Sequence, residues 1–177
     1  MPILILVSTA IILLFLLTYW EYKDSIVYQF GYYLKHNKPE VYFHLNRGVR
    51  RKQLNNLEKT YNVEFPKEFR RLYSWRNGQR DNCYENFIDN FMFMSIGEVI
   101  STKEMLDSMI GYDFDDPNWW KVEWVPFLHN GGGDYCVLDL KTGEIVSFYH
   151  EFDDRSVIAS NLEELLEFVI DEKEIVF

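Results

Sequence analysis

The chain has 177 residues, of which 18% are aromatic, so an intrinsically disordered chain is excluded and one domain with a sizeable core plus an appendage is expected. The formal net charge of −10 is uneven: residues 1–53 carry seven Lys/Arg and three Asp/Glu (+4), and residues 54–177 carry 11 and 25 (−14). The acidic part would repel nucleic acid, which excludes a nucleic-acid partner, and would attract a basic protein.

The first predicted element is an apolar run from Ile3 to Trp20, 18 residues without a charge. As an α-helix this run spans about 27 Å, close to the roughly 30 Å hydrocarbon core of a bilayer. Residues 1–22 are therefore predicted to form a single transmembrane anchor, with Tyr19, Trp20 and Tyr22 at the interface. Two alternatives stay open: a cleaved signal peptide, for which a basic n-region and a small-residue cleavage site are lacking, and a buried core helix.

The orientation follows from the basic residues, because Lys23, Lys35 and Lys38 come after the run and none precedes it. The positive-inside rule then predicts a single-pass membrane protein with its C-terminal domain in the cytoplasm. The two cysteines, Cys83 and Cys136, form no CxxC pair and fit a reducing compartment, although a disulfide between them stays open.

Residues 23–49 are predicted to be a juxtamembrane connector. Apolar residues at helical spacing from Ile26 to Leu34 indicate a short amphipathic helix there. A basic cluster follows, which could contact anionic lipid headgroups or simply begin a solvated helix. Its members are Arg47, Arg50, Arg51 and Lys52.

Residues 50–177 are predicted to form the globular domain, which opens with two helices. The first has Leu54, Leu57 and Tyr61 on one face and ends near Asn62. The second begins at Pro66, which suits a first helical turn, and Asn77-Gly78 is interpreted as its C-terminal stop. Its inward residues are Phe69, Leu72 and Tyr73.

The rest of the domain is predicted to be strands and two helices. Short apolar runs predict strands at 91–94, 126–128, 135–140 and 145–150, and residues 141–144 form a Gly-containing hairpin turn between the last two. A helix is expected over 98–109, and a closing helix follows a capping box at Ser160-Asn161-Leu162-Glu163. These elements predict an α+β fold, in which helices flank an antiparallel sheet.

The loop His129-Asn130-Gly131-Gly132-Gly133-Asp134-Tyr135 precedes an apolar strand. A phosphate-binding glycine loop needs a following helix and usually a Lys, whereas a strand follows here and Asp134 would repel an anion. The glycines instead permit a close turn with positive φ, in which Asp134 accepts backbone N–H bonds. We therefore interpret the loop as structural.

Several motifs between residues 50 and 170 form a recognisable combination. They are Leu57-Glu58-x-x-Tyr61-Asn62-Val63-x-Phe65-Pro66-x-x-Phe69, Asn77-Gly78, Trp124-Val125-Pro126-Phe127, Gly131-Gly132-Gly133-Asp134-Tyr135, Leu138-Asp139, Gly143, His150-Glu151 and Ser160-Asn161-Leu162-Glu163-Glu164-Leu165-Leu166. Together these motifs resemble the SUKH superfamily, which includes Smi/Knr-type yeast cell-wall regulators and many bacterial immunity proteins. The resemblance covers roughly residues 50–170 and implies an α+β binding module without catalytic machinery, commonly one that neutralises a toxin.

Residues of catalytic type form no convincing constellation. The four histidines lack a close ligand pair, so no metal or other cofactor is expected. His150 and Glu151 could act as an acid–base pair, but such a pair is more often a surface or packing feature. Cys136 alternates with Leu138 and Leu140, which favours a buried thiol over a nucleophile. We expect a protein that is not an enzyme.

The strongest binding candidate is the segment 111–120, in which acids and large aromatics alternate. This composition suits a hot spot for a basic protein, whereas the alternative places Trp119 and Trp120 in the core. A second acidic region at 151–154 could extend the same surface. The predicted partner-binding residues are Asp113, Asp115, Asp116, Trp119, Trp120, Glu151, Asp153 and Asp154.

Two functions of different class follow from these features. The first is a membrane-anchored immunity protein that neutralises a basic toxin such as a nuclease. The second is a membrane-tethered scaffold or regulator of cell-envelope or cell-wall assembly, which uses the same domain for another protein.

Overall fold

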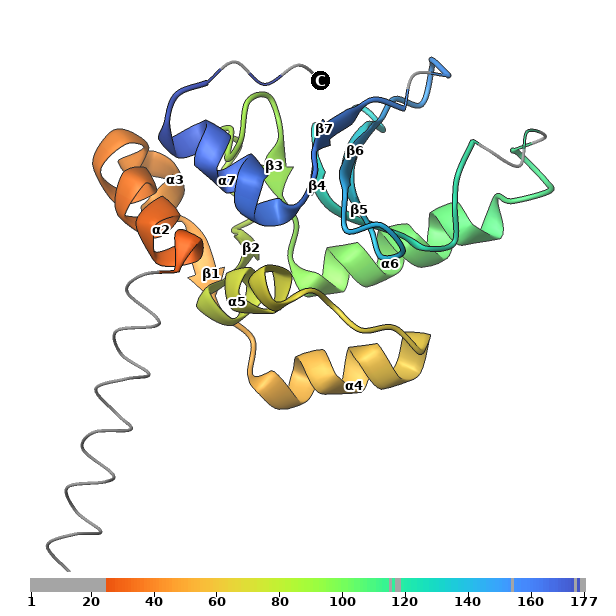
Figure 1. Ribbon diagram of the computed structural model, residues 1–177, viewed down its shortest axis with the longest axis horizontal. Helices are drawn as coiled ribbons and strands as arrows, with labels where there is room; N and C mark the ends of the chain where they lie inside the picture. The colour runs from red at the N-terminus through yellow and green to blue at the C-terminus, as the bar shows by residue number, and fades with distance from the viewer. Residues whose placement is uncertain (1–24, 115, 117–118, 154, 174, 176–177) are drawn as a thin grey trace, which may run out of the picture.

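The computed structural model describes residues 25–114, 116, 119–153, 155–173 and 175 (Figure 1). It confirms the α+β class. An antiparallel five-stranded sheet has the order β3 (Met92–Phe93), β4 (Trp124–His129), β5 (Tyr135–Asp139), β6 (Ile145–Phe148), β7 (Val157–Ala159), and a separate two-stranded sheet pairs β1 (Leu45–Arg47) with β2 (Arg76–Gln79). Helices α2 (Ile26–Asn37), α5 (Lys67–Trp75) and α7 (Leu162–Ile170) pack together beside the sheet, while α4 (Arg51–Tyr61) and α6 (Ile96–Ser108) lie along its lower edge (Figure 1).

Helix α2 (Ile26–Asn37) opens the described chain and belongs to the domain. Its N-cap Ser25 accepts a hydrogen bond from the Tyr28 backbone N–H at 3.4 Å. Phe30 and Leu34 are fully buried in the main core, and α2 packs against α7 and α5. The segment 23–49, which we expected to be a connector, thus supplies core residues from position 26 onward, because the apolar face of α2 covers the closing helix.

The predicted transmembrane anchor at residues 1–22 lies outside the described residues. Among the residues that are described, no helix is long and apolar enough to cross a membrane.

Two short elements, a helix and a strand, link α2 to the helices α4 and α5. Helix α3 (Pro39–Phe43) and strand β1 (Leu45–Arg47) lead into α4 (Arg51–Tyr61), which ends at Asn62 in the left-handed conformation, as the sequence predicts. Helix α5 (Lys67–Trp75) follows the N-cap Pro66 and buries the expected face of Phe69, Leu72 and Tyr73.

A charged pair fastens α4 to α5. Glu58 accepts hydrogen bonds from the Arg70 guanidinium and, at 2.9 Å, from the Phe65 backbone N–H. Burial favours the neutral form of Glu58, but these hydrogen bonds outweigh it and lower the pKa of the carboxyl. Arg70 also donates to Asn55 Oδ1 at 2.6 Å. The two helices are therefore joined by polar contacts over the short loop between them.

The interpretation of Asn77-Gly78 as a helix stop is wrong. Helix α5 runs directly into strand β2 (Arg76–Gln79), which contains both residues. Asn77 Oδ1 accepts the Ile96 N–H at 2.8 Å at the start of α6, and Gly78 has φ +74. A Cβ at Gly78 would lie 2.2 Å from the Ser95 nitrogen, so glycine is required by this close approach and not by a helix end.

The sheet is assembled from one short strand and a meander. Strand β3 (Met92–Phe93) pairs with β4 (Trp124–His129), and α6 (Ile96–Ser108) lies between them in sequence. Strands β5 (Tyr135–Asp139), β6 (Ile145–Phe148) and β7 (Val157–Ala159) complete the sheet. The β5–β6 hairpin is the one predicted, whereas β1, β7 and α3 were not anticipated.

The two faces of the sheet bury different cores. Cys136 and Leu138 of β5 face the main core beneath α2, α5 and α7, as the predicted alternation requires. Val137, between them, faces a smaller cluster on the opposite side with Trp120, Trp124 and Phe148. Cys83 and Cys136 are buried free thiols, which excludes the disulfide that the sequence left open.

Two predicted motifs have structural roles, one beside each core. Trp124 Nε1 donates to Asp139 Oδ2 at 3.0 Å, and Asp139 Oδ1 accepts the Lys141 and Thr142 N–H groups of the hairpin turn. Helix α7 (Leu162–Ile170) has Asn161 as its N-cap, one residue after Ser160, at which the predicted capping box begins. Asn161 caps it, while Glu164 Oε2 accepts from Ser160 N and Oγ, both at 2.6 Å.

Candidate partner-binding face

The segment after α6 forms a tight turn that exposes an aromatic and an acid. The Tyr112, Asp113 and Phe114 N–H groups all donate to the Met109 carbonyl, at 3.1, 3.0 and 2.9 Å. Gly111 enters the turn with φ +73, a conformation that glycine adopts without strain. Tyr112 is 85% exposed, and Asp113 is exposed beside it.

A buried lysine holds the following segment against α6. Lys103 is only 6% exposed, and its ammonium donates to the Val122 and Trp124 carbonyls at 2.6 and 3.1 Å. The same group pairs with Asp107, whose Oδ1 accepts the Trp120 indole N–H at 2.7 Å. These bonds satisfy the buried ammonium and fix the path of the segment across the sheet.

This arrangement corrects the prediction for Trp120. Its side chain is 1% exposed, packed edge-on against Trp124 at 5.6 Å and Phe148 at 5.3 Å between ring centroids. Trp120 is therefore core and has no surface for a partner. Trp119 is half-buried and stays at the rim of the same cluster.

Arg155 joins the two acidic loops. Its guanidinium lies over the Trp119 ring at 4.7 Å and over the Phe148 ring at 4.5 Å. It also donates to the carbonyls of Trp119, Tyr149 and Phe152 at 3.3, 3.1 and 2.6 Å. The loop between β6 and β7 thus packs beside the turn after α6, and both project from the same end of the molecule (Figure 1).

The second loop carries further exposed acids around an exposed aromatic. Glu151 and Asp153 are exposed on either side of Phe152, which is 63% exposed. Asp115 and Asp154, also predicted as partner-binding, lie outside the described residues. We call the described set the acidic face: Tyr112, Asp113, Asp116, Glu151, Phe152 and Asp153.

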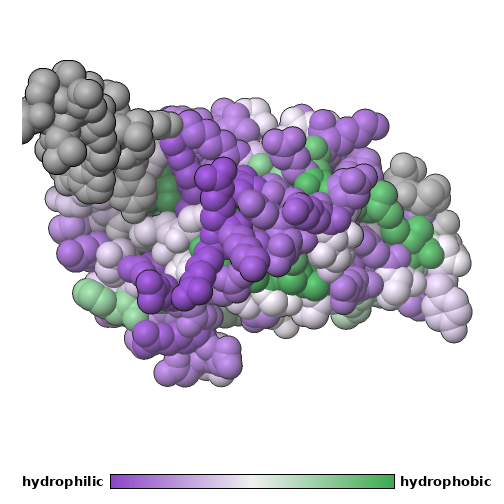
Figure 2. All heavy atoms as spheres, turned by 90° about the horizontal axis from the view of Figure 1, so that it is seen from below, coloured by the Kyte–Doolittle hydropathy of each residue, from purple (hydrophilic) through white to green (hydrophobic). Residues whose placement is uncertain are grey.

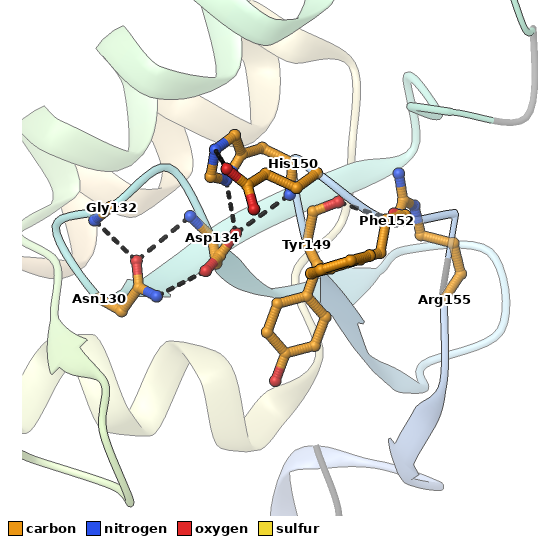
Figure 3. A network of polar contacts seen from close by, with 8 residues as sticks. Asn130, Gly132, Asp134, Tyr149, His150, Phe152 and Arg155 are labelled. Atoms are coloured by element: carbon orange, nitrogen blue, oxygen red, sulfur yellow. Dashed lines mark hydrogen bonds and ion pairs between the residues drawn. The ribbon is translucent and has the colours of Figure 1, made fainter.

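The glycine loop supports this end of the sheet (Figure 3). Asn130 Oδ1 accepts the Gly132 and Asp134 N–H groups at 2.8 and 3.2 Å, so it is Asn130 that closes the turn. Asp134 instead accepts the His150 backbone N–H at 3.0 Å and contacts His150 Nδ1 at 2.8 Å. The expected backbone bond to Asp134 exists, but it comes from the end of β6 and not from its own turn.

The electrostatics of this link are favourable. Partial burial works to raise the pKa of Asp134, but hydrogen bonds from His150 and Asn130 outweigh it and lower that pKa below its usual value. Gly133, with φ +100, lies so close that a Cβ there would be 3.2 Å from His150 Nδ1. Through these contacts the glycine loop positions His150, the residue that precedes Glu151, at the base of the acidic face.

Reactive chemistry has little support in the described residues. His150 Nε2 lies 3.7 Å from Glu151 Oε1, while its Nδ1 is engaged by Asp134. Burial raises the pKa of the Cys136 thiol well above its usual value, which disfavours a thiolate nucleophile. Within the part of the chain that is described, no group of three His, Cys, Asp or Glu residues could hold a metal ion.

Sequence reasoning missed the residues that assemble the face. Lys103, Asp107 and Arg155 act through contacts over 13 to 36 residues, which no local pattern encodes. The exposed Tyr112 and Phe152 carry a signal that was available, because each stands next to an acid outside any apolar periodicity.

A protein-family model matches most of the described domain. The model of the SMI1 / KNR4 family (SUKH-1) matches residues 48–167, more than half of the chain and both loops of the acidic face. No curated protein matches the chain.

Proposed function

The chain belongs to the SMI1 / KNR4 family (SUKH-1), and from this premise we propose that it is a non-enzymatic immunity protein that binds and neutralises a toxin. The family suggests an immunity-protein-like module that acts by contacting another protein. The observation that carries the proposal is the acidic face, where exposed acids lie beside the exposed Tyr112 in one loop and beside the exposed Phe152 in the other. Such a surface favours a basic partner, with the aromatics as anchors and the acids as a steering rim.

A nuclease toxin fits this chemistry best. A protein whose substrate is a polyanion carries a basic surface, and an acidic protein that covers this surface blocks substrate access. The acidic balance of −14 over residues 54–177 supports association by electrostatic attraction.

The proposal includes a single-pass membrane anchor at residues 1–22, with the binding domain in the cytoplasm. It is supported by the uncharged run from Ile3 to Trp20 and by the lysines that follow it. This run also supports the second candidate, a membrane-tethered regulator of envelope assembly, which would offer the same face to another protein.

Co-expression tests the proposal. The gene product encoded beside this chain is expressed in a sensitive host, alone and together with the chain, and growth is measured. We expect the chain to restore growth and to co-purify with that product. A neutralised variant carrying Asp113→Asn, Asp116→Asn, Glu151→Gln and Asp153→Asn should lose most of this protection.

The matched control removes four exposed acids from other elements: Glu85→Gln, Glu163→Gln, Glu167→Gln and Glu172→Gln. It should protect as the unchanged chain does. If the neighbouring product is harmless, or its toxicity is unaffected by the chain, the immunity function is refuted and the regulator is favoured.

A further inference from the structure

The charge of the domain is separated into two regions. Residues 41–80 carry ten Lys/Arg and three Asp/Glu, so their net charge is +7. Residues 81–177 carry five Lys/Arg and 22 Asp/Glu, so their net charge is −17. The basic region forms α4, α5 and the two-stranded sheet in the lower part of Figure 1, whereas the two loops of the acidic face project at the right and upper right. The chain is thus polarised from one end to the other.

Most cations of the basic region are presented to solvent. Two of its three acids are used internally, since Glu58 pairs with Arg70 and Glu68 pairs with Arg71 at 2.9 Å. The lower view shows hydrophilic side chains spread across this surface (Figure 2). Seven of the ten cations are exposed, and we call the six that precede β2 the basic face: Arg47, Arg50, Arg51, Lys52, Lys59 and Lys67.

A hollow between α4 and α5 concentrates the positive charge. Arg51, Lys67, Arg70 and Arg71 line it, together with Glu64 as the sole acid among its lining residues. Arg51 and Lys67, beside the ion-paired Arg70 and Arg71, suit the phosphate or carboxylate of a headgroup at this hollow, because Arg and Lys donate charge-assisted hydrogen bonds to such oxygens.

The start of the domain lies at this same end. Four residues separate Trp20, the last residue of the uncharged run, from Ser25, so covalent geometry keeps Ser25 within about 18 Å of the end of that run. The first turn of α2 lies level with α5, against which α2 packs, and above α4 (Figure 1). Any membrane that holds the run is therefore close to the basic face.

We propose that the basic face docks on the anionic headgroups of the membrane that carries the apolar run, so that the acidic face points away from the bilayer toward its partner. This inference rests on the anchor of the proposed function. Each Lys or Arg near an anionic leaflet strengthens association roughly fivefold, and the tether makes docking an intramolecular step. The same membrane repels the acidic loops, so both ends of the molecule favour one orientation.

Hydrogen exchange of the full-length chain tests the docking. The chain is reconstituted into liposomes of phosphatidylcholine alone or with phosphatidylserine, and amide exchange is followed by mass spectrometry. We expect the amides of 50–61 to exchange about fivefold more slowly on anionic liposomes, and those of 149–153 to be unchanged. At about 1 M salt, where the Debye length is about 3 Å, the difference should disappear.

A variant with Arg50→Gln, Arg51→Gln and Lys52→Gln should lose the lipid-dependent difference. The matched control carries Lys121→Gln, Lys141→Gln and Lys173→Gln, which remove the same amount of charge from other parts of the chain. This control should keep the lipid-dependent difference in exchange. Thermal unfolding shows that both variants fold. Equal exchange of 50–61 on the two lipids, or equal loss in variant and control, overturns the docking.

An alkaline carbonate wash of the same liposomes tests the anchor separately. Release of the chain refutes the anchor. If the released chain still shows slow exchange of 50–61 when anionic liposomes are present at low salt, the docking stands without the anchor; if it does not, both are refuted.

Discussion

Asp134 shows how one carboxylate can position a loop of the acidic face. It lies between the glycine turn and the end of β6, and it accepts from Asn130 Nδ2 at 2.6 Å and from the His150 N–H at 3.0 Å. A charged acceptor with several donors contributes more than an ordinary hydrogen bond, and its loss leaves the donors unpaired.

Asp134→Asn should therefore lower the free energy of unfolding at pH 7 by about 1–3 kcal/mol. Because the folded-state pKa of Asp134 is lowered, its stabilising contribution is present above the unfolded pKa of about 4 and is lost as the pH falls through the folded pKa. The gap between the original chain and the variant should shrink between pH 5 and pH 2. Urea unfolding across this range measures it, and a gap independent of pH would contradict the argument.

The two adjacent tryptophans provide a second contrast at the residue scale. Trp120→Ala should cost about 3–5 kcal/mol of stability, because a fully buried ring is lost from the smaller core. Trp119→Ala should cost about 1–2 kcal/mol, since it removes a half-buried ring and its contact with Arg155. Equilibrium urea unfolding of the pair checks the order; equal costs would show that Trp120 is not core.

At the scale of elements, α6 and the segment after it depend on Lys103. Removing the ammonium leaves the Val122 and Trp124 carbonyls without their donor and takes a partner from Asp107. Burial makes this loss larger than that of a surface ion pair.

Lys103→Met should reduce stability by about 2–4 kcal/mol and speed proteolysis within 110–122, because the segment is released from α6. The control is Lys141→Met, at an exposed turn position, which should change stability by less than about 0.5 kcal/mol. Thermal unfolding and limited proteolysis measure the two effects. Unchanged cleavage of 110–122 in the Lys103 variant would show that other contacts hold the segment.

Helices and strands were predictable where apolar residues repeat at helical or strand spacing over enough positions. The closing helix and the β5–β6 hairpin follow from their apolar spacing and turn residues. Strands β1 and β7, at three residues each, are too short to show alternation, and β4 has five consecutive buried residues because both faces are covered. The Asn77-Gly78 pair looks like a helix stop, but its role depends on α6, which follows 18 residues later.

The candidate site was predictable only in part, because contacts between residues far apart in the chain bring its parts together. The acids stand out in the sequence, but their adjacency depends on Arg155 reaching across 36 positions to Trp119. Which of two neighbouring tryptophans is buried depends on the ion pair of the buried Lys103 with the half-buried Asp107, which lies 13 positions before Trp120 in the chain.

At the scale of the whole molecule, the anchor gives a separate prediction. The full-length chain should remain with membranes after alkaline carbonate washing, because the uncharged run favours the bilayer. A chain that starts at Lys23 keeps all the core residues of the described domain and should be recovered without membranes. Membrane association of the shortened chain that survives the wash would place the anchor elsewhere.

The proposed function requires the acidic face to bind a basic partner. The association rate of the chain with the neighbouring toxin domain, measured by stopped flow between about 50 and 500 mM salt, tests this binding. Association should slow steeply with salt, and the four-acid variant Asp113→Asn, Asp116→Asn, Glu151→Gln, Asp153→Asn should associate about tenfold or more slowly with a flatter salt dependence. The control lacking Glu85, Glu163, Glu167 and Glu172 should keep most of the rate. Equal rates and salt slopes for the two folded variants would contradict the account.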